Sequence, residues 1–437
     1  MPRRPLLLSA LASLVLAACA TRPVPPRADA ALDPIATDYV RLTLAIGEVE
    51  PGYVDAYYGP AEWAAEAKAQ PRTLAQLRET ADALQQRLAA LDPATLSAPA
   101  QRRRAFLAAQ LTAAQTRLRM RAGEKLSFDE EARGLFAVDL QLKPLAAYDA
   151  ELAKIEALLP GDGPLWQRMD AATRQTAIPR DRLDAVMRAA IAECRRRTLQ
   201  HIALPANERF TLEFVTGQPW SGYNWYKGDA TSLIQVNTDL PVLMSRAVDL
   251  GCHEGYPGHH VLNVLLEQHL SRGLGWREFT VYPLYSPQSF LAEGSANYGI
   301  ELAFPGEERL AFERDVLYPL AGLDPALAAR DLALLRARAA IAGARMTIAR
   351  DYLDGRIDRP TALALVQKYQ LVSPERAEQS VAFTEHYRSY VINYGAGLDQ
   401  VRAHVEAAGP TPEQRWAAME TLLSEPTIPA DLAVAAH

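Results

Sequence analysis

The chain has 437 residues, of which 49% are hydrophobic and 22% are charged, as is typical of a globular protein with a large core. Its formal net charge of -6 gives no electrostatic reason to expect nucleic acid as a partner. We therefore expect no nucleic-acid-binding function.

The first residues have the pattern of an export signal. Arg3 and Arg4 precede an apolar run from Leu6 to Ala18, which is too short to span a bilayer permanently and ends in small residues. Its end, Leu16-Ala17-Ala18-Cys19, resembles a bacterial lipobox, which implies cleavage before Cys19 and lipid on that residue. The alternative is an ordinary signal peptide with a chance cysteine.

On this interpretation residues 1–18 are the signal peptide, and residues 19–32 are a lipidated cysteine with a proline-rich tether. Ala20, rather than aspartate, follows Cys19, which favours the outer membrane, facing the periplasm. We therefore expect a lipid-anchored protein of the cell envelope. Its other cysteines, Cys194 and Cys252, can either pair in this compartment or remain two separate buried thiols.

Amphipathic helices dominate the next part of the chain. Apolar residues recur at helical spacing in the segments 33–49, 74–91, 98–122, 144–159, 165–177 and 181–201. Helices separated by such short breaks form bundle-like layers, whose expected role here is that of a scaffold.

A small antiparallel β-sheet is predicted next. Residues Phe210 to Val215 alternate in polarity, and Ser232 to Asn237 follow after a connection that contains glycine and aromatic residues. An exposed sheet edge can bind an extended peptide, which then adds a further strand to the sheet. We predict Ser232 to Asn237 as such an edge; the alternative is a sheet that only supports the helix that follows it.

The stretch from Gly251 to His260, GCHEGYPGHH, carries the strongest chemical signal. A His-Glu pair followed by more histidine is typical of zinc hydrolases, in which imidazoles hold the metal and the carboxylate acts on its water. The usual spacing is His-Glu-x-x-His, but here Pro257 stands where the second histidine is expected. On a regular helix His259 would point about 240° away from His253, and His260 would lie about 10 Å further along the axis.

Pro257 and Gly258 predict a distortion that removes this difficulty. Proline cannot donate a hydrogen bond to the carbonyl of His253 and its ring collides there, while glycine accepts backbone angles closed to other residues. A local bulge could bring His259 to the position of a normal second ligand. The alternative is a loop cluster of histidines that binds no metal.

A third metal ligand is expected downstream. A helix is predicted after Ser286-Pro287, and Glu293 lies on it among small and apolar neighbours. Because a buried carboxylate without a partner is costly, and a metal removes that cost, we predict Glu293 as the third ligand. Asn297, one turn later, is positioned to orient a ligand.

These motifs together resemble one bacterial family. The HExxPGHH motif at 253–260, the Glu-Gly-x-Ala motif at 293–296, and Tyr394 with Gly397 are similar to the family called domain of unknown function 885. Its members are regarded as gluzincin-like zinc metallopeptidases that are mostly helical with a small sheet. The resemblance covers about residues 33 to 407.

The resemblance implies a role for each residue of the motifs. It makes His253, His259 and Glu293 the zinc ligands and Glu254 the general base. His260 would be an orienting or substrate-facing group. For stabilising the oxyanion we expect Tyr394 first, and then His386, Tyr390 or Tyr387.

We therefore expect a mainly α protein with a multi-helix, bundle-like N-terminal part at 33–205. A zincin-like catalytic part at 206–437 would carry the small sheet and form one compact unit with it. The expected function is Zn²⁺-dependent hydrolysis of amide bonds in a peptide or protein. The alternatives are a non-catalytic envelope lipoprotein that serves as a binding or assembly module, and an amidase of cell-wall peptide. The sequence does not determine the oligomeric state.

Overall fold

The computed structural model describes residues 28–218 and 220–433. The protein is mainly helical with two small β-sheets, which confirms the predicted fold class. The predicted signal segment and the lipidation site Cys19 lie outside the described residues. Within the described ranges, no helix combines the length and the apolar character that crossing a membrane requires.

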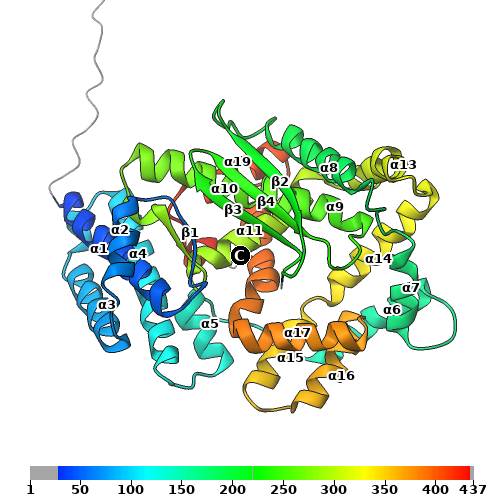
Figure 1. Ribbon diagram of the computed structural model, residues 1–437, viewed down its shortest axis with the longest axis horizontal. Helices are drawn as coiled ribbons and strands as arrows, with labels where there is room; N and C mark the ends of the chain where they lie inside the picture. The colour runs from blue at the N-terminus through cyan, green and yellow to red at the C-terminus, as the bar shows by residue number, and fades with distance from the viewer. Residues whose placement is uncertain (1–27, 219, 434–437) are drawn as a thin grey trace, which may run out of the picture.

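Five helices form a layer at one end of the molecule (blue to cyan in Figure 1). Local capping explains where two of them begin, because Thr73 with Gln76, and Ser127 with Glu130, each form a capping box. The predicted segments 74–91 and 98–122 agree with two of these helices to within two residues. The five helices are α1 (Leu32–Val49), α2 (Ala61–Ala69), α3 (Leu74–Ala89), α4 (Ala98–Arg121) and α5 (Phe128–Phe136).

A second group of helices, far apart in sequence, shares one hydrophobic cluster at the lower right of Figure 1. It contains α6 (Asp149–Leu158), α7 (Leu165–Arg174), α14 (Ala328–Ile341), α15 (Ala344–Leu353), α16 (Arg359–Gln370) and α17 (Pro374–Tyr387). The other helices are α8 (Leu183–Thr198), α9 (Met244–Leu250), α10 (His259–Leu266), α11 (Pro287–Ala303), α12 (Glu308–Phe312), α13 (Tyr318–Ala321), α18 (Leu398–Ala407) and α19 (Pro412–Ser424).

The larger sheet has three strands, β2 (Arg209–Val215), β3 (Gly222–Gly228) and β4 (Thr231–Asn237), in the order β2-β4-β3. Strand β4 pairs with β3 antiparallel but with β2 parallel, so the prediction of a purely antiparallel sheet is wrong in part. The prediction that Ser232 to Asn237 form an edge is also wrong. Strand β3, within the glycine- and aromatic-containing connection, pairs with that side of β4 and is itself an edge strand.

The smaller sheet joins the N-terminal layer to the centre of the molecule. It consists of β1 (Val54–Tyr57) and β5 (Val281–Pro283), paired antiparallel, and β1 lies beside β3 (Figure 1). The ladder is irregular between Val54 and Ala56, so that Asp55 has no partner on β5. Such a β-bulge turns a side chain away from the regular alternation of the strand.

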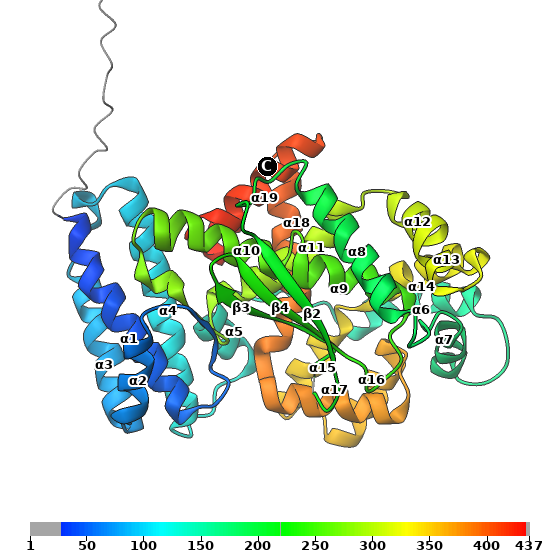
Figure 2. The same cartoon turned by 45° about the horizontal axis from the view of Figure 1, so that its top comes forward.

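Helices cover one face of the three-stranded sheet, with α10 and α11 behind it in Figures 1 and 2. On β4, Ser232, Ile234 and Val236 are buried and alternate with partly exposed residues, as a strand covered on one face requires. A second hydrophobic cluster joins α1, α3, α4 and α5 to residues 281–290, 346–349 and 390–392. The helical part at 33–205 therefore shares a core with the part at 206–437.

Candidate metal centre

The HExxPGHH motif lies where one helix stops and another starts. Helix α9 passes into a π-helical turn at Gly251–Gly255, and the chain becomes extended at Tyr256. The Tyr256–Pro257 peptide bond is cis, and α10 then begins at His259. The predicted distortion is therefore present, but as a break between two helices rather than as a bulge within one.

Gly258 is the residue that makes this break possible. Its backbone nitrogen donates a hydrogen bond to the carbonyl of Cys252 at 3.0 Å, and a Cβ atom at this position would lie 1.8 Å from the carbonyl oxygen of His253. Only a residue without a side chain fits there. The close crossing returns His259 to the side of His253, with their ring centroids 4.7 Å apart.

Three predicted ligands converge at this place. Single ligand atoms of His253, His259 and Glu293 all lie within 4.8 Å of one another. The Oε2 atom of Glu293 is 3.2 Å from Nε2 of His253 and 3.9 Å from Nε2 of His259. Ligands on a tetrahedral zinc with bonds of about 2.0–2.1 Å are separated by about 3.3 Å, so small side-chain movements would suffice to enclose the ion.

The donors themselves fit a metal of this kind. The buried Oε2 atom of Glu293 has no hydrogen-bond partner among the described residues, and such an orphaned carboxylate oxygen requires an explanation. Two imidazoles and one carboxylate are a ligand set of catalytic zinc sites, which keep a fourth position open. The His253 and His259 side chains remain 14% exposed, so the centre can be reached from solvent.

Asn297 contacts the first imidazole of the motif. Its Oδ1 atom lies 3.2 Å from Nδ1 of His253, so Nδ1 is the nitrogen that carries the proton and Nε2 is free to bind a metal. Asn297 and Glu293 are one turn apart on α11, which begins at Pro287 with Ser286 as its N-cap.

Two glycines bring a second helix directly against α11. A Cβ atom on Gly294 would lie 2.5 Å from the backbone of Gly397, and one on Gly397 would lie 2.8 Å from the carbonyl oxygen of Phe290. The backbones therefore touch, and the π-helical turn Asn393–Gly397 packs on α11 beside Glu293.

Among the candidate donors, Tyr390 is the one that contacts the centre directly. Its hydroxyl donates a hydrogen bond to Oε1 of Glu293 at 2.9 Å. The ring of Tyr394 lies 5.8 Å from that of Tyr390. His386 is exposed and lies edge-on against Tyr387, so the structure does not bring it into contact with the three ligands.

The surroundings of Glu254 and His259 suit acid–base chemistry near neutral pH. Burial raises the pKa of Glu254 to about 7; the charge of His253 opposes this shift and that of Glu293 adds to it. Burial and the charge of His253 lower the pKa of His259 to about 4, so that its imidazole is neutral. The carboxylate of Glu254 makes no hydrogen bond to the described residues, although the side-chain amide of Asn224 donates to its backbone carbonyl at 2.6 Å.

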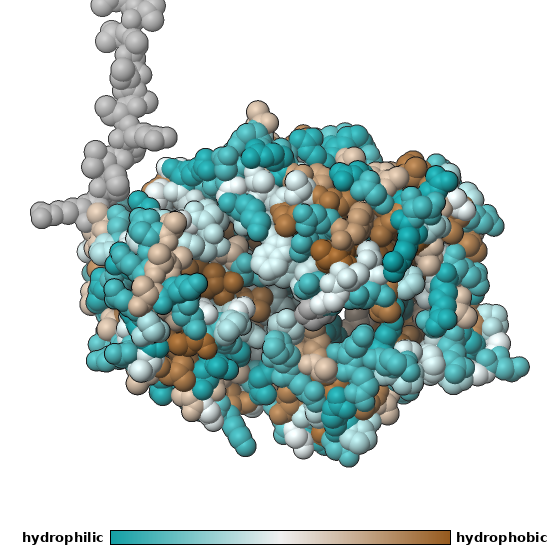
Figure 3. Space-filling view, in the orientation of Figure 1, coloured by the Kyte–Doolittle hydropathy of each residue, from teal (hydrophilic) through white to brown (hydrophobic). Residues whose placement is uncertain are grey.

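The face of the molecule seen in Figure 3 is hollowed near its middle. Strand β3 forms one side of the centre, because a Cβ atom on Gly222 would lie 3.1 Å from Oε1 of Glu254.

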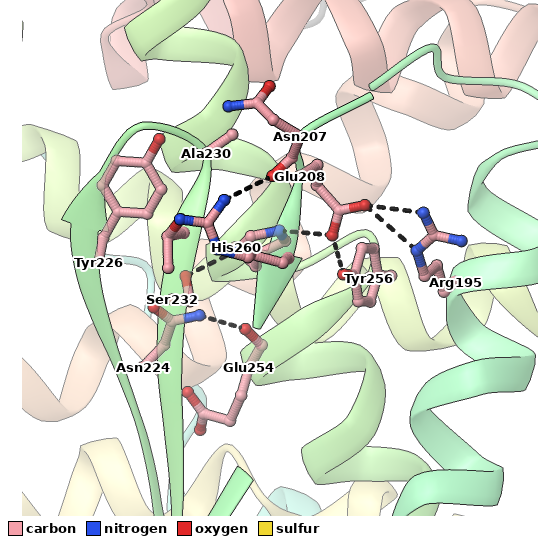
Figure 4. Close-up of polar contacts among 12 residues, drawn as sticks. Arg195, Asn207, Glu208, Asn224, Tyr226, Ala230, Ser232, Glu254, Tyr256 and His260 are labelled. Carbon is pink, nitrogen blue, oxygen red and sulfur yellow. Dashed lines mark hydrogen bonds and ion pairs between the residues drawn. The ribbon is translucent and has the colours of Figure 1, made fainter. Parts of the chain in front are cut away.

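His260 points away from the metal centre. It is fully buried, with Nδ1 2.7 Å from the hydroxyl of Ser232 and Nε2 2.9 Å from Oε1 of Glu208 (Figure 4). The same carboxylate accepts hydrogen bonds from Tyr256 and, at 2.9 Å, from Arg195. Since both ring nitrogens are occupied, His260 neither binds the metal nor faces a substrate, and it holds α10 against the sheet.

Replacing Glu208 by glutamine is expected to lower stability near neutral pH. Burial alone would raise the pKa of Glu208, but hydrogen bonds from His260, Tyr256 and Arg195 lower it from 4.5 to about 2. A carboxyl group whose pKa is lower in the folded than in the unfolded state stabilises the fold at pH values above its unfolded-state pKa. This stabilisation is lost as the pH falls towards the folded-state pKa. The full contribution is about 3 kcal/mol at pH 7.

The test is thermal unfolding of the wild type and Glu208→Gln between pH 7 and pH 3, with the exposed Glu213→Gln on β2 as control. About 2 of the roughly 3 kcal/mol should be lost by pH 3, so the Tm difference between wild type and variant should shrink strongly. A Tm difference that stays constant over this range would contradict the assignment.

A disulfide bond joins the start of the HExxPGHH motif to helix α8. Cys252, the residue before His253, is bonded to Cys194 on α8. Of the two possibilities left open by the sequence, the structure therefore has the pair. The cross-link closes a loop of 58 residues, for which chain entropy predicts about 4 kcal/mol of stabilisation.

Comparisons with known proteins identify the fold only. No family model and no curated protein matches the sequence. The chain resembles a crystal structure of the "putative lipoprotein from Colwellia psychrerythraea", with a TM-score of 0.52 and 14% identity over 93% of this chain and 73% of that chain. It also matches the M32 carboxypeptidase from Deinococcus radiodurans R1, with 14% identity over 90% and 89% of the chains, but that TM-score of 0.35 is too low to support a conclusion.

Proposed function

We propose that this protein is a zinc-dependent hydrolase of peptide bonds. The observation that carries the proposal is the convergence of His253, His259 and Glu293 within 4.8 Å, with Glu254 next to the first of them in the chain. The unpartnered Oε2 atom of Glu293 supports a cation at this place. The resemblance of the motif to the domain of unknown function 885 family supports the same reaction.

The bound zinc would supply a Lewis acid that activates water and polarises the peptide carbonyl. Glu254 accepts the proton of that water on its carboxylate and delivers it to the nitrogen of the leaving amine. The hydroxyl of Tyr394, whose ring packs against that of the Glu293 partner Tyr390, serves as the donor to the carbonyl oxygen. Tyr390 and Asn297 hold Glu293 and His253 in position.

We further propose that the protein acts in the cell envelope. The lipobox-like sequence ending at Cys19 supports a lipid anchor, and the name of the structural neighbour from Colwellia psychrerythraea is in line with it. Labelling with a radioactive or clickable fatty acid in a bacterial host tests this part separately. The wild type should be labelled, whereas Cys19→Ser should not.

The main test measures metal content and peptide hydrolysis on the same preparations. The purified wild type should hold one equivalent of zinc, or take it up when zinc is added, and should cleave members of a broad peptide library. His253→Ala should lose both the zinc and the hydrolysis, whereas the control His269→Ala, at an exposed position, should lose neither. A wild type that takes up no zinc would overturn the proposal.

A further inference from the structure

A carboxylate outside the predicted ligand set, that of Asp55, lies near the metal centre. It accepts a hydrogen bond from Tyr223, and the residue before Tyr223, Gly222, lies against Glu254. Asp55 occupies the β-bulge of β1, between residues that pair regularly with β5. Bulges re-aim side chains and are common next to active sites. Asp55 keeps some contact with solvent, yet burial and then the charges of Glu293 and Glu254 raise the pKa of its carboxyl to about 8.

Among the residues that the structure describes, no cation neutralises this group. Within residues 28–218 and 220–433, Asp55 forms no ion pair, and its polar partner is the hydroxyl of Tyr223, which donates to Oδ1. Asp55 therefore adds a third acidic group close to Glu254 and Glu293. Such a group is unfavourable unless a cation offsets it.

The surroundings of Asp55 favour an organic cation. Two tyrosines on the adjacent strands lie next to this carboxylate: Tyr282 on β5 pairs with Ala56, the residue after Asp55, and the hydroxyl of Tyr223 on β3 donates to the carboxylate itself. Aromatic faces attract ammonium groups, and a carboxylate supplies the hydrogen-bond acceptor. This combination is poorly suited to an anion or to an apolar group.

The bond between Asp55 and Tyr223 also marks an end of the binding surface. Strand β3 is an edge of its sheet, and its free side faces β1, which belongs to a different sheet. The Tyr223 hydroxyl crosses from β3 to β1 to reach Asp55. Because β1 occupies this side of β3, the bond between Tyr223 and Asp55 closes the space between the two strands.

We propose that Asp55, held by Tyr223, binds the α-ammonium group of a peptide substrate, so that the enzyme removes residues from the amino end. This inference rests on the proposed peptide hydrolysis at the adjacent metal centre. A free amino end pairs with Asp55, whereas an acetylated end leaves the carboxylate without a partner and is discriminated against.

The first experiment compares kcat/KM for Ala-Ala-Ala-Ala, its N-acetylated form and acetyl-Lys-Ala-Ala-Ala. The wild type should prefer the free amino end by about 100-fold over both acetylated peptides. Asp55→Asn, in which the amide oxygen can still accept from Tyr223, should lose this preference while retaining zinc. Glu62→Gln, an exposed carboxylate on the following helix, is the matched control and should keep it.

Equal rates for free and acetylated peptides, or a preference for the acetyl-lysyl peptide, would overturn the inference and leave the hydrolase intact. Calorimetry on zinc-loaded Glu254→Gln tests whether Asp55 binds the α-ammonium group even if no peptide is cleaved. There the free tetrapeptide should bind about 100-fold tighter than its acetylated form, and adding Asp55→Asn should abolish the difference. Equal binding, or no binding of either peptide, would overturn the subsite.

Discussion

Replacing Glu254 by glutamine is expected to leave zinc bound and to reduce peptide hydrolysis about 1,000-fold, within the range typical of a lost general base. The substitution keeps the size of the side chain but removes the group that accepts and returns the proton. The carboxylate makes no hydrogen bond to the described residues, so the fold does not depend on its charge. Metal analysis and kcat/KM for one cleaved peptide measure both properties.

Glu301→Gln is a suitable control for this variant, because Glu301 is an exposed carboxylate on α11, two turns after the proposed ligand Glu293. It should keep both the zinc and the activity. If Glu254→Gln kept more than a tenth of the wild-type kcat/KM, another group would be the base. If it lost its zinc, Glu254 would have to be a ligand.

The local elements could be predicted because their signals lie within a few residues. Apolar spacing, with a capping box at the start of α3 and the N-cap Ser97 at the start of α4, determines these two helices almost to the residue. Ser286 with Pro287 marks the start of α11. The sequence does not predict strand β3, because glycines stand at both of its ends and asparagine lies within it, and these residues are more common in turns than in strands. The strand order depends on contacts between distant segments, which no local pattern encodes.

The candidate site, too, could be predicted only in part from the sequence. The spacing of HExxPGHH excludes a regular helix, and the structure agrees, but the sequence alone leaves the choice between His259 and His260 open. That choice depends on Ser232 and Glu208, which hold His260 from the sheet side. Likewise, Tyr390 becomes the contact to Glu293 only through the packing of Gly397 on Gly294.

Replacing His259 and His260 by alanine, one at a time, distinguishes a metal ligand from a structural residue. His259→Ala removes one of three protein ligands and is expected to weaken zinc binding by more than about 100-fold, since each ligand of a zinc site contributes about 3 kcal/mol. Its fold should survive, because the His259 imidazole is partly exposed and shares no buried network.

His260→Ala should behave in the opposite way. It removes the hydrogen bonds that the imidazole forms with the buried Glu208 and Ser232, so the free energy of unfolding should fall by about 3 kcal/mol while the zinc stoichiometry stays at one. Zinc titration and thermal unfolding of both variants, each compared with His269→Ala, measure the two effects. If His260→Ala lost its zinc at temperatures where it is folded, His260 rather than His259 would be the metal ligand. The break at Pro257 and Gly258 would then position His260 at the metal.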